Sequence, residues 1–236
     1  MRQQQDYAFQ RSQRSIDDIA GIQNSFMTKV YGWMSAGLVI TALVAMFVAN
    51  NASNMALVAN NYWILIIAQF GLVIFLSARI HKMSAVTATT LFILYSALTG
   101  VTLSSIFYVY PLANIGSTFL ITAGTFIGMS IFGLTTKRDL TSMGNLLYMA
   151  LLGLILTSVV NIFLGSSLVY WISSAVGVLI FVGLIAFDSQ KLRDMGYQIA
   201  DGESAQKMAI HGALSLYLDF INLFLLLLRF FGGSRD

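Results

Sequence analysis

Residues 209–231 read AIHGALSLYLDFINLFLLLLRFF. The stretch is apolar and long enough to cross a bilayer as a helix, which takes about 20 residues. It carries one carboxylate near its middle, Asp219. A charge at the centre of a membrane helix costs about 2.5–3.5 kcal/mol on insertion scales. The rest of the chain must therefore offer Asp219 a partner or a wet cavity.

The polar and small residues of this segment fall on one stripe of a helical net. They are Gly212, Ser215, Asp219, Asn222 and Arg229. Leucines occupy the other faces. The pattern predicts a polar seam that faces protein, with Ser215 and Asn222 beside Asp219.

Composition places the whole chain in a membrane. Of the 236 residues, 57% are hydrophobic and 10% are charged, where soluble domains have about 25% charged residues, and the mean hydropathy is +0.77. Three blocks, 30–78, 83–136 and 140–187, contain no Asp, Glu, Lys or Arg. Each is too long for one span and fits two spans with a short turn. The absence of cysteine excludes disulfides and thiolate metal sites.

Three such hairpins and the final helix predict an all-α polytopic fold with seven transmembrane helices in a domain over residues 30–231, after a polar tail at 1–29. The expected helices cover about 30–49, 62–78, 85–108, 117–134, 145–164, 170–188 and 209–231. An Asn-rich turn, NNASNMALVANN, separates the first two.

The distribution of basic residues predicts the orientation. Lys and Arg occur in the tail and in the loops after the second, fourth and sixth helices, and the intervening turns have none. The positive-inside rule then puts the amino terminus in the cytoplasm, and the tail has no apolar core typical of a signal peptide. The basic pI near 9.2 reflects this orientation, so we expect no nucleic-acid partner. Seven crossings put the carboxyl end outside, although Arg229 and Arg235 also suit a last helix that dips in and returns.

A second carboxylate, Asp188, lies in the last turn expected for the sixth helix. The topology puts it on the same side as the start of the seventh helix, so it can meet Asp219. Two carboxyls in one low-dielectric site cannot both ionise cheaply, and a shared proton would act as a pH-dependent latch. Arg79, at the end of the second helix on the same side, is either a clamp on one carboxylate or an orientation anchor. His81 and His211 lack the spacing of metal ligands.

The motifs LSLYLDFINLFLLLLRFFG around Asp219 and IAFDSQ around Asp188 resemble the Bax inhibitor-1 family. TGVTLSSIF in the third helix and GLTTKRDLTSMG after the fourth resemble bacterial inner-membrane members of that family. The resemblance covers about residues 28–232, and the motif in the seventh helix is specific.

The resemblance implies a fold with the seventh helix central and the other six around it. It also implies a pH-sensitive calcium leak channel in which Asp188 and Asp219 share a proton and contact the calcium ion. Arg79, as the aligned arginine, would lock the closed state. Some members have a glutamate in the second helix where this chain has Gln69, and that departure weakens the leak interpretation.

Other functions are weighed against the leak channel. Some bacterial relatives resemble regulators of a membrane-anchored AAA protease. In that case the protease would bind the chain through a disordered basic tail at residues 1–25. An intramembrane aspartyl protease is disfavoured because Asp219 lacks the Gly-x-Gly-Asp motif and Pro111 lacks the Pro-Ala-Leu motif. A secondary transporter would show paired broken helices, which are absent from the pattern. We therefore expect no enzyme and no cofactor. We expect a monomer in the bacterial inner membrane, with calcium as the transported ion.

Overall fold

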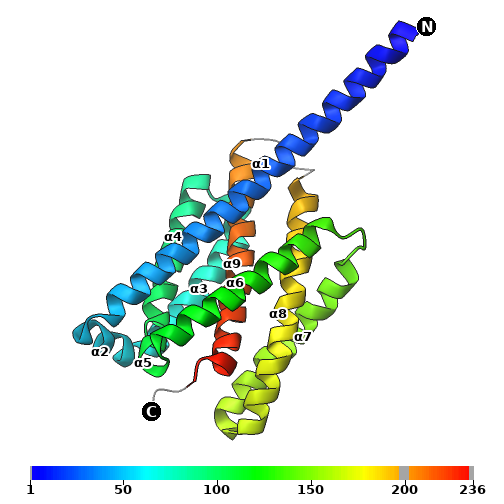
Figure 1. The fold of residues 1–236 in the computed structure, drawn as a ribbon. Helices are drawn as coiled ribbons and strands as arrows, with labels where there is room; N and C mark the ends of the chain where they lie inside the picture. Colours follow the sequence, from blue (N-terminus) through cyan, green and yellow to red (C-terminus); the bar gives the residue numbers. More distant parts are fainter. Residues whose placement is uncertain (1, 197–201, 234–236) are drawn as a thin grey trace.

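The protein is described by a computed structural model that covers residues 2–196 and 202–233, with side chains from residue 21 onward. This part of the chain is helical and contains no strand (Figure 1). Its helices are α1 (Arg2–Ala49), α2 (Ala52–Asn60), α3 (Tyr62–Arg79), α4 (Ala85–Leu103), α5 (Ile106–Val109), α6 (Leu112–Thr135), α7 (Thr141–Leu164), α8 (Ser167–Gly196) and α9 (Glu203–Phe231), with a 3₁₀ turn η1 (Ile80–Lys82) after α3.

Seven of the described helices are long and apolar enough to cross a membrane, which confirms the all-α polytopic prediction. They are α3, α6, α7, α8 and α9, together with Gly21–Ala49 of α1 and the stretch Ala85–Val109 that contains α4 and α5. Their outer faces carry exposed apolar side chains such as Ile67, Leu152 and Leu179, as lipid contact requires.

Several boundaries differ from the sequence prediction. The Asn-rich turn contains a short helix, α2, because the Asn51 side chain accepts hydrogen bonds from the backbone N–H groups of Ser53 and Asn54 and caps it. Asp188 lies two turns inside α8 and not in its last turn, since α8 continues to Gly196. The helix that contains Asp219 is continuous over 29 residues, or about 44 Å. It has no break at which the chain could turn back, so the structure favours a full crossing over a last helix that dips in and returns.

The amino-terminal tail also differs from the expectation of disorder. The backbone of residues 2–25 is helical and continues into the first span as α1. Gln and Arg, which are common in this tail, have high helix propensity. Figure 1 shows the first part of α1 projecting beyond the other helices.

Packing encloses α9 more than any other span. It packs against α1, α4, α6 and α8, whereas α3 packs mainly on α4 and α7 on α8. In the apolar window of α9, 56% of the residues are buried, compared with none in that of α7. Leu216, Tyr217 and Leu223 of α9 are fully buried. The helix that carries Asp219 thus lies in the protein interior.

Two close helix contacts fix α8 near Asp188. Gly133 of α6 lies directly against the backbone carbonyl of Ala186, and Gly144 of α7 lies against the ring of Phe187. A Cβ atom at either glycine would overlap these neighbours. Small residues of this kind let membrane helices approach closely. As a result, both α6 and α7 pack closely against α8 at the two residues just before Asp188.

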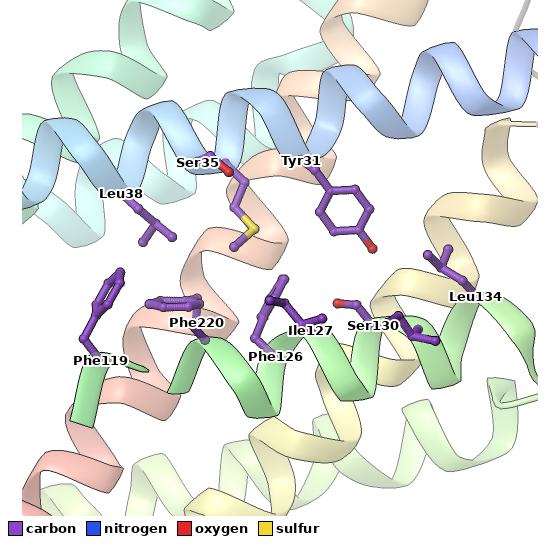
Figure 2. Close-up of a pocket in the computed structure, with 12 residues that line it drawn as sticks. Tyr31, Ser35, Leu38, Phe119, Phe126, Ile127, Ser130, Leu134 and Phe220 are labelled. Atoms are coloured by element: carbon purple, nitrogen blue, oxygen red, sulfur yellow. The ribbon is translucent and has the colours of Figure 1, made fainter. Parts of the chain in front are cut away.

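A groove separates α1 from α6, which have few direct contacts with each other (Figure 2). Its volume is about 360 Å³. We call it the α1–α6 groove; its lining includes Tyr31, Met34, Leu38, Ala123, Phe126, Ser130 and Phe220. Phe220 belongs to α9 and closes the groove from behind.

Candidate functional site: the Asp188–Asp219 pair

Both predicted carboxylates are buried at the contact between α8 and α9. Asp188 is 3% exposed and Asp219 is 6% exposed. Each lies within a helix long enough to span the membrane. Burial of both groups is unusual, because ionised side chains in a membrane interior are costly and are retained mainly for function.

Asp188 is held by hydroxyl groups from two other helices. The Tyr148 hydroxyl of α7 donates to Asp188 Oδ1 at 3.0 Å. Ser215 Oγ of α9 donates a short hydrogen bond to Asp188 Oδ2. The carboxylate therefore joins α7, α8 and α9, and both of its oxygens have a donor.

Asp219 lies one helical turn after Ser215, or about 6 Å along α9. Because Ser215 contacts Asp188, the Asp188 carboxylate meets α9 about one turn from Asp219. Asp219 Oδ2 is buried and accepts no hydrogen bond from any residue in the described part of the chain. A buried polar atom without a partner carries its full desolvation penalty. Asp219 is therefore a buried carboxyl without a donor at Oδ2 among the described residues.

The remaining seam residues of α9, which are Gly212, Asn222 and Arg229, do not contact the carboxylate pair through any hydrogen bond or close packing contact among the described residues. Gly212 packs against Leu192 of α8 and Val30 of α1, and Asn222 donates within its own helix to the Leu218 carbonyl at 2.8 Å. Arg229 lies at the far end of the seam. Its guanidinium donates to Ser174 Oγ at 3.0 Å and lies 4.7 Å from the centre of the Tyr170 ring. Ser215 is thus the seam residue that reaches the carboxylate pair.

Arg79 and Gln69 lie away from the pair. Arg79 is exposed at the end of α3 and forms no ion pair with a carboxylate among the described residues. Gln69 donates to Thr99 Oγ1 of α4 at 3.1 Å. In this structure Tyr148 and Ser215, and not Arg79, contact Asp188.

Two tyrosines were missed by the sequence reasoning. Tyr148 lies in an apolar helix, where nothing in the pattern distinguishes it from an interfacial aromatic residue. Tyr217 lies in the Asp219 motif and is fully buried. Its hydroxyl is 2.6 Å from Thr41 Oγ1, which itself donates to the Ser96 carbonyl at 2.9 Å. Tyr217 must therefore be the donor to Thr41, and the chain of bonds joins α9, α1 and α4.

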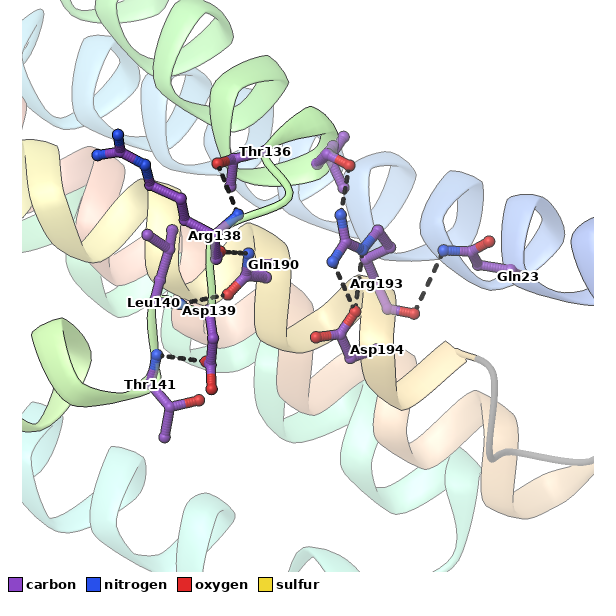
Figure 3. A network of polar contacts seen from close by, with 10 residues as sticks. Gln23, Thr136, Arg138, Asp139, Leu140, Thr141, Gln190, Arg193 and Asp194 are labelled. Atoms are coloured by element: carbon purple, nitrogen blue, oxygen red, sulfur yellow. Dashed lines mark hydrogen bonds and ion pairs between the residues drawn. The ribbon is translucent and has the colours of Figure 1, made fainter.

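A second polar network lies at the end of the bundle where α6 and α8 end and α9 begins, which we call the Arg193 end (Figure 3). The Gln190 side chain accepts from the Leu140 N–H and donates to the Arg138 carbonyl, both at 2.8 Å. Arg193 donates to the Leu134 carbonyl at 2.6 Å and pairs with Asp194 at 2.9 Å. These bonds fix the loop between α6 and α7 onto α8, a few residues from Asp188.

The donor set of the pair is small for a resident metal. The described residues contain no group of three or more His, Cys, Asp or Glu side chains that could hold an ion. Calcium takes six to eight oxygen ligands, so Asp188 and Asp219 alone would offer a passing cation only part of its shell.

Comparison with known proteins identifies the family. The family described as "Inhibitor of apoptosis-promoting Bax1" matches residues 23–236. The chain belongs to the Bax inhibitor-1 family. It is similar to Inner membrane protein YbhL of Escherichia coli (strain K12), with 54% identity over 232 residues that cover 96% of this chain and 99% of the relative. It is also similar to an uncharacterized protein of Borreliella burgdorferi, with 49% identity over 91% of this chain and 94% of the relative.

Family membership agrees with the fold. The seven apolar helices and the name of the Escherichia coli relative support a multi-pass protein of the inner membrane. The matched region begins at residue 23, so it includes the whole apolar part of α1 and both carboxylates.

Proposed function

We propose that this family member is a pH-sensitive calcium leak channel of the inner membrane, gated by a proton shared between Asp188 and Asp219. The observation that carries the proposal is the burial of both carboxylates at one helix contact, with Asp219 Oδ2 lacking a hydrogen-bond donor among the described residues. Two negative charges at such a site repel each other strongly, so one proton stabilises the packed arrangement.

Loss of that proton supplies the gating force in this proposal. The two ionised carboxylates would repel each other across the α8–α9 contact, and the pair would then attract a hard cation that prefers oxygen ligands. Tyr148 and Ser215 hold Asp188 in the packed state. The role inferred for Arg79, locking the closed state, would require a movement that brings its exposed guanidinium to Asp188.

The proposed orientation places the Arg193 end in the cytoplasm. The loops at that end are basic, because in or beside them lie Lys137, Arg138, Lys191 and Arg193. Short basic loops are retained on the cytoplasmic side of the membrane. The α1 tail would then also be cytoplasmic, and α9 would end outside. The proposal includes no enzymatic activity and no cofactor, and calcium enters only as the transported ion.

Calcium flux into liposomes tests the channel proposal. We expect the purified wild type to leak calcium increasingly from pH 5 to pH 8, and Asp188→Asn and Asp219→Asn each to abolish the pH dependence. Asp139→Asn is the matched control, because Asp139 is exposed in the loop between α6 and α7. Flux no greater than in empty liposomes for wild type would exclude the channel.

A regulatory function is the second candidate, and the projecting part of α1 favours it. A helix that extends beyond the bundle offers a partner, such as a membrane-anchored AAA protease, an accessible surface. Deletion of residues 2–20 separates the two functions. A leak would survive the deletion, whereas binding through the projecting helix would be lost.

A further inference from the structure

The α1–α6 groove combines a buried floor with an exposed rim. Met34, Phe126 and Phe220 on its floor are 3–5% exposed. Ile127 and Ile131 on its rim are 57% and 55% exposed. Because these residues lie within membrane-length helices, the rim opens sideways into the bilayer and not into water.

Two hydroxyl groups point into the groove near its Arg193 end (Figure 2). The Tyr31 hydroxyl oxygen is buried and has no hydrogen-bond partner in the described part of the chain. Ser130 Oγ accepts a hydrogen bond from Ser189 Oγ at 3.2 Å and keeps its own O–H as a donor. The Tyr31 hydroxyl is thus a buried donor without an acceptor, a costly arrangement unless a bound molecule supplies one.

The depth of these hydroxyls matches the ester level of a phospholipid. Tyr31 follows Lys29 by two residues, and Lys29 is the last charged residue before the charge-free stretch of α1. Leu134, which also lines the groove, precedes the first charge after α6, Lys137, by three residues. Tyrosine is typical of this boundary between head groups and acyl chains.

A cationic group lies just beyond the hydroxyls. The Arg193 guanidinium donates to the carbonyl of Leu134 at 2.6 Å and pairs with the exposed Asp194 at 2.9 Å, and the Arg193 carbonyl accepts from Gln23 of α1 at 3.4 Å (Figure 3). Arg193 therefore spans the gap between α6 and α1 at the end of the groove. Basic pockets between membrane helices on the cytoplasmic side are typical binding sites for lipid head groups.

The lining of the groove favours a flexible apolar occupant. Its volume is about 360 Å³, and its floor is formed by the apolar side chains of Met34, Phe126 and Phe220. A single hydrocarbon chain can follow such a groove, and the apolar floor matches it.

We propose that the α1–α6 groove is a glycerophospholipid site. One acyl chain from the leaflet at the Arg193 end lies in the groove, an ester carbonyl accepts from Tyr31 and Ser130, and the phosphate lies beside Arg193. The site is independent of ion conduction. Its Ser130 is bonded to Ser189, which follows Asp188 in α8.

Native mass spectrometry of the full chain, purified in detergent and supplied with phosphatidylglycerol, tests the site. Wild type should retain one phospholipid. Ala123→Trp fills the groove and should lower the retained fraction at least fivefold, whereas Leu120→Trp, at a 71% exposed position of the same helix outside the groove, should leave it unchanged. Equal retention by all three proteins would overturn the proposal.

Tyr31→Phe removes the hydroxyl and nothing else, so it keeps the test decisive if Ala123→Trp fails to fold. We expect it to lower retention at least twofold with an unchanged melting temperature of the lipid-free protein. Retention equal to wild type would overturn the assigned role of the ester carbonyl.

Photocrosslinking in membranes identifies the occupant directly. A benzophenone amino acid in place of Ile127, on the rim, should add the mass of one phospholipid on illumination. The same group in place of Leu120 reports the background of bulk lipid and should give at least threefold less adduct. Adducts with a polypeptide, or equal lipid adducts at both positions, would contradict the proposal.

Discussion

Ser215 of α9 donates a hydrogen bond to the Asp188 carboxylate of α8, one helical turn before Asp219. The bond fixes the register between the two helices, since Asp219 then lies opposite the residues around Asp188. Ser215→Ala should lower the free energy of unfolding by about 0.6–1.7 kcal/mol, the range for hydrogen bonds between membrane helices. Thermal melting in detergent measures the change.

The control for that substitution is Thr90→Ala, which removes a hydroxyl that is exposed and bonded within its own helix to the Val86 carbonyl. It should leave the melting temperature almost unchanged. Equal effects of Ser215→Ala and Thr90→Ala would show that the interhelical bond contributes nothing to stability.

The glycine contacts on α8 give a second prediction. Gly133→Ala forces a Cβ atom into the Ala186 carbonyl, and overpacking of this kind costs about 1–3 kcal/mol. Gly128→Ala lies on the same helix with nothing within 4 Å of its Cβ position, and should stabilise α6 slightly through helix propensity. A melting temperature for Gly133→Ala at or above that of Gly128→Ala would contradict the described packing of α6 on α8.

The bond between Tyr217 and Thr41 predicts an energetic coupling between α9 and α1. Tyr217→Phe and Thr41→Val each break the 2.6 Å contact. A double-mutant cycle should therefore give a coupling energy of about 0.6–1.7 kcal/mol. Tyr108→Phe, at a position that is 54% exposed, replaces Tyr217→Phe in the control cycle and should show no coupling to Thr41→Val.

The loop between α6 and α7 should make a small contribution to the pH dependence of stability. Hydrogen bonds from the Thr141 hydroxyl and from its backbone N–H, the latter at 2.8 Å, lower the pKa of Asp139 below 3.8. A lowered folded pKa stabilises the protein above the unfolded pKa, and this stability is lost as the pH falls through the folded value. Asp139→Asn should therefore lower the melting temperature slightly at neutral pH, and its melting temperature should converge on that of wild type as the pH falls below about 4, where the stabilisation by ionised Asp139 is lost.

Melting curves from pH 2.5 to pH 7 check this prediction against wild type and Thr141→Val, which removes only the hydroxyl. Thr141→Val should show a reduced slope in the same acidic range. A difference between wild type and Asp139→Asn that grows as the pH falls would have the wrong sign for a lowered pKa.

Much of the fold could be predicted because charge is so unevenly distributed along the chain. Charge-free blocks predict pairs of spans, and the structure has seven such helices. The buried seam of α9 could also be predicted, since Ser215 and Asp219 recur at helical spacing. These features depend on local pattern alone.

The partners of the carboxylates could not be predicted because they depend on how each helix is rotated about its axis. Tyr148 reaches Asp188 only because α7 turns that face toward α8. Arg79 was placed beside Asp188 from topology and resemblance, and here its side chain is exposed. The helical tail was missed because low hydrophobicity indicates solvent exposure but does not distinguish an exposed helix from a disordered chain.

The close packing of Gly133 and Gly144 against α8 makes α6, α7 and α8 one rigid unit, which we call the α6–α8 unit. The Ala186 carbonyl packs against Gly133 and the Phe187 ring packs against Gly144. None of the three helices can therefore slide past the others without a steric clash. At the end of the bundle opposite Arg193, Arg229 of α9 contacts Ser174 and Tyr170 of α8, which belongs to this unit. We therefore expect Asp188 and Asp219 to separate by a rigid-body rotation of the α6–α8 unit relative to α9. The rotation would pivot at the Arg229 contacts, and the displacement would be largest at the Arg193 end.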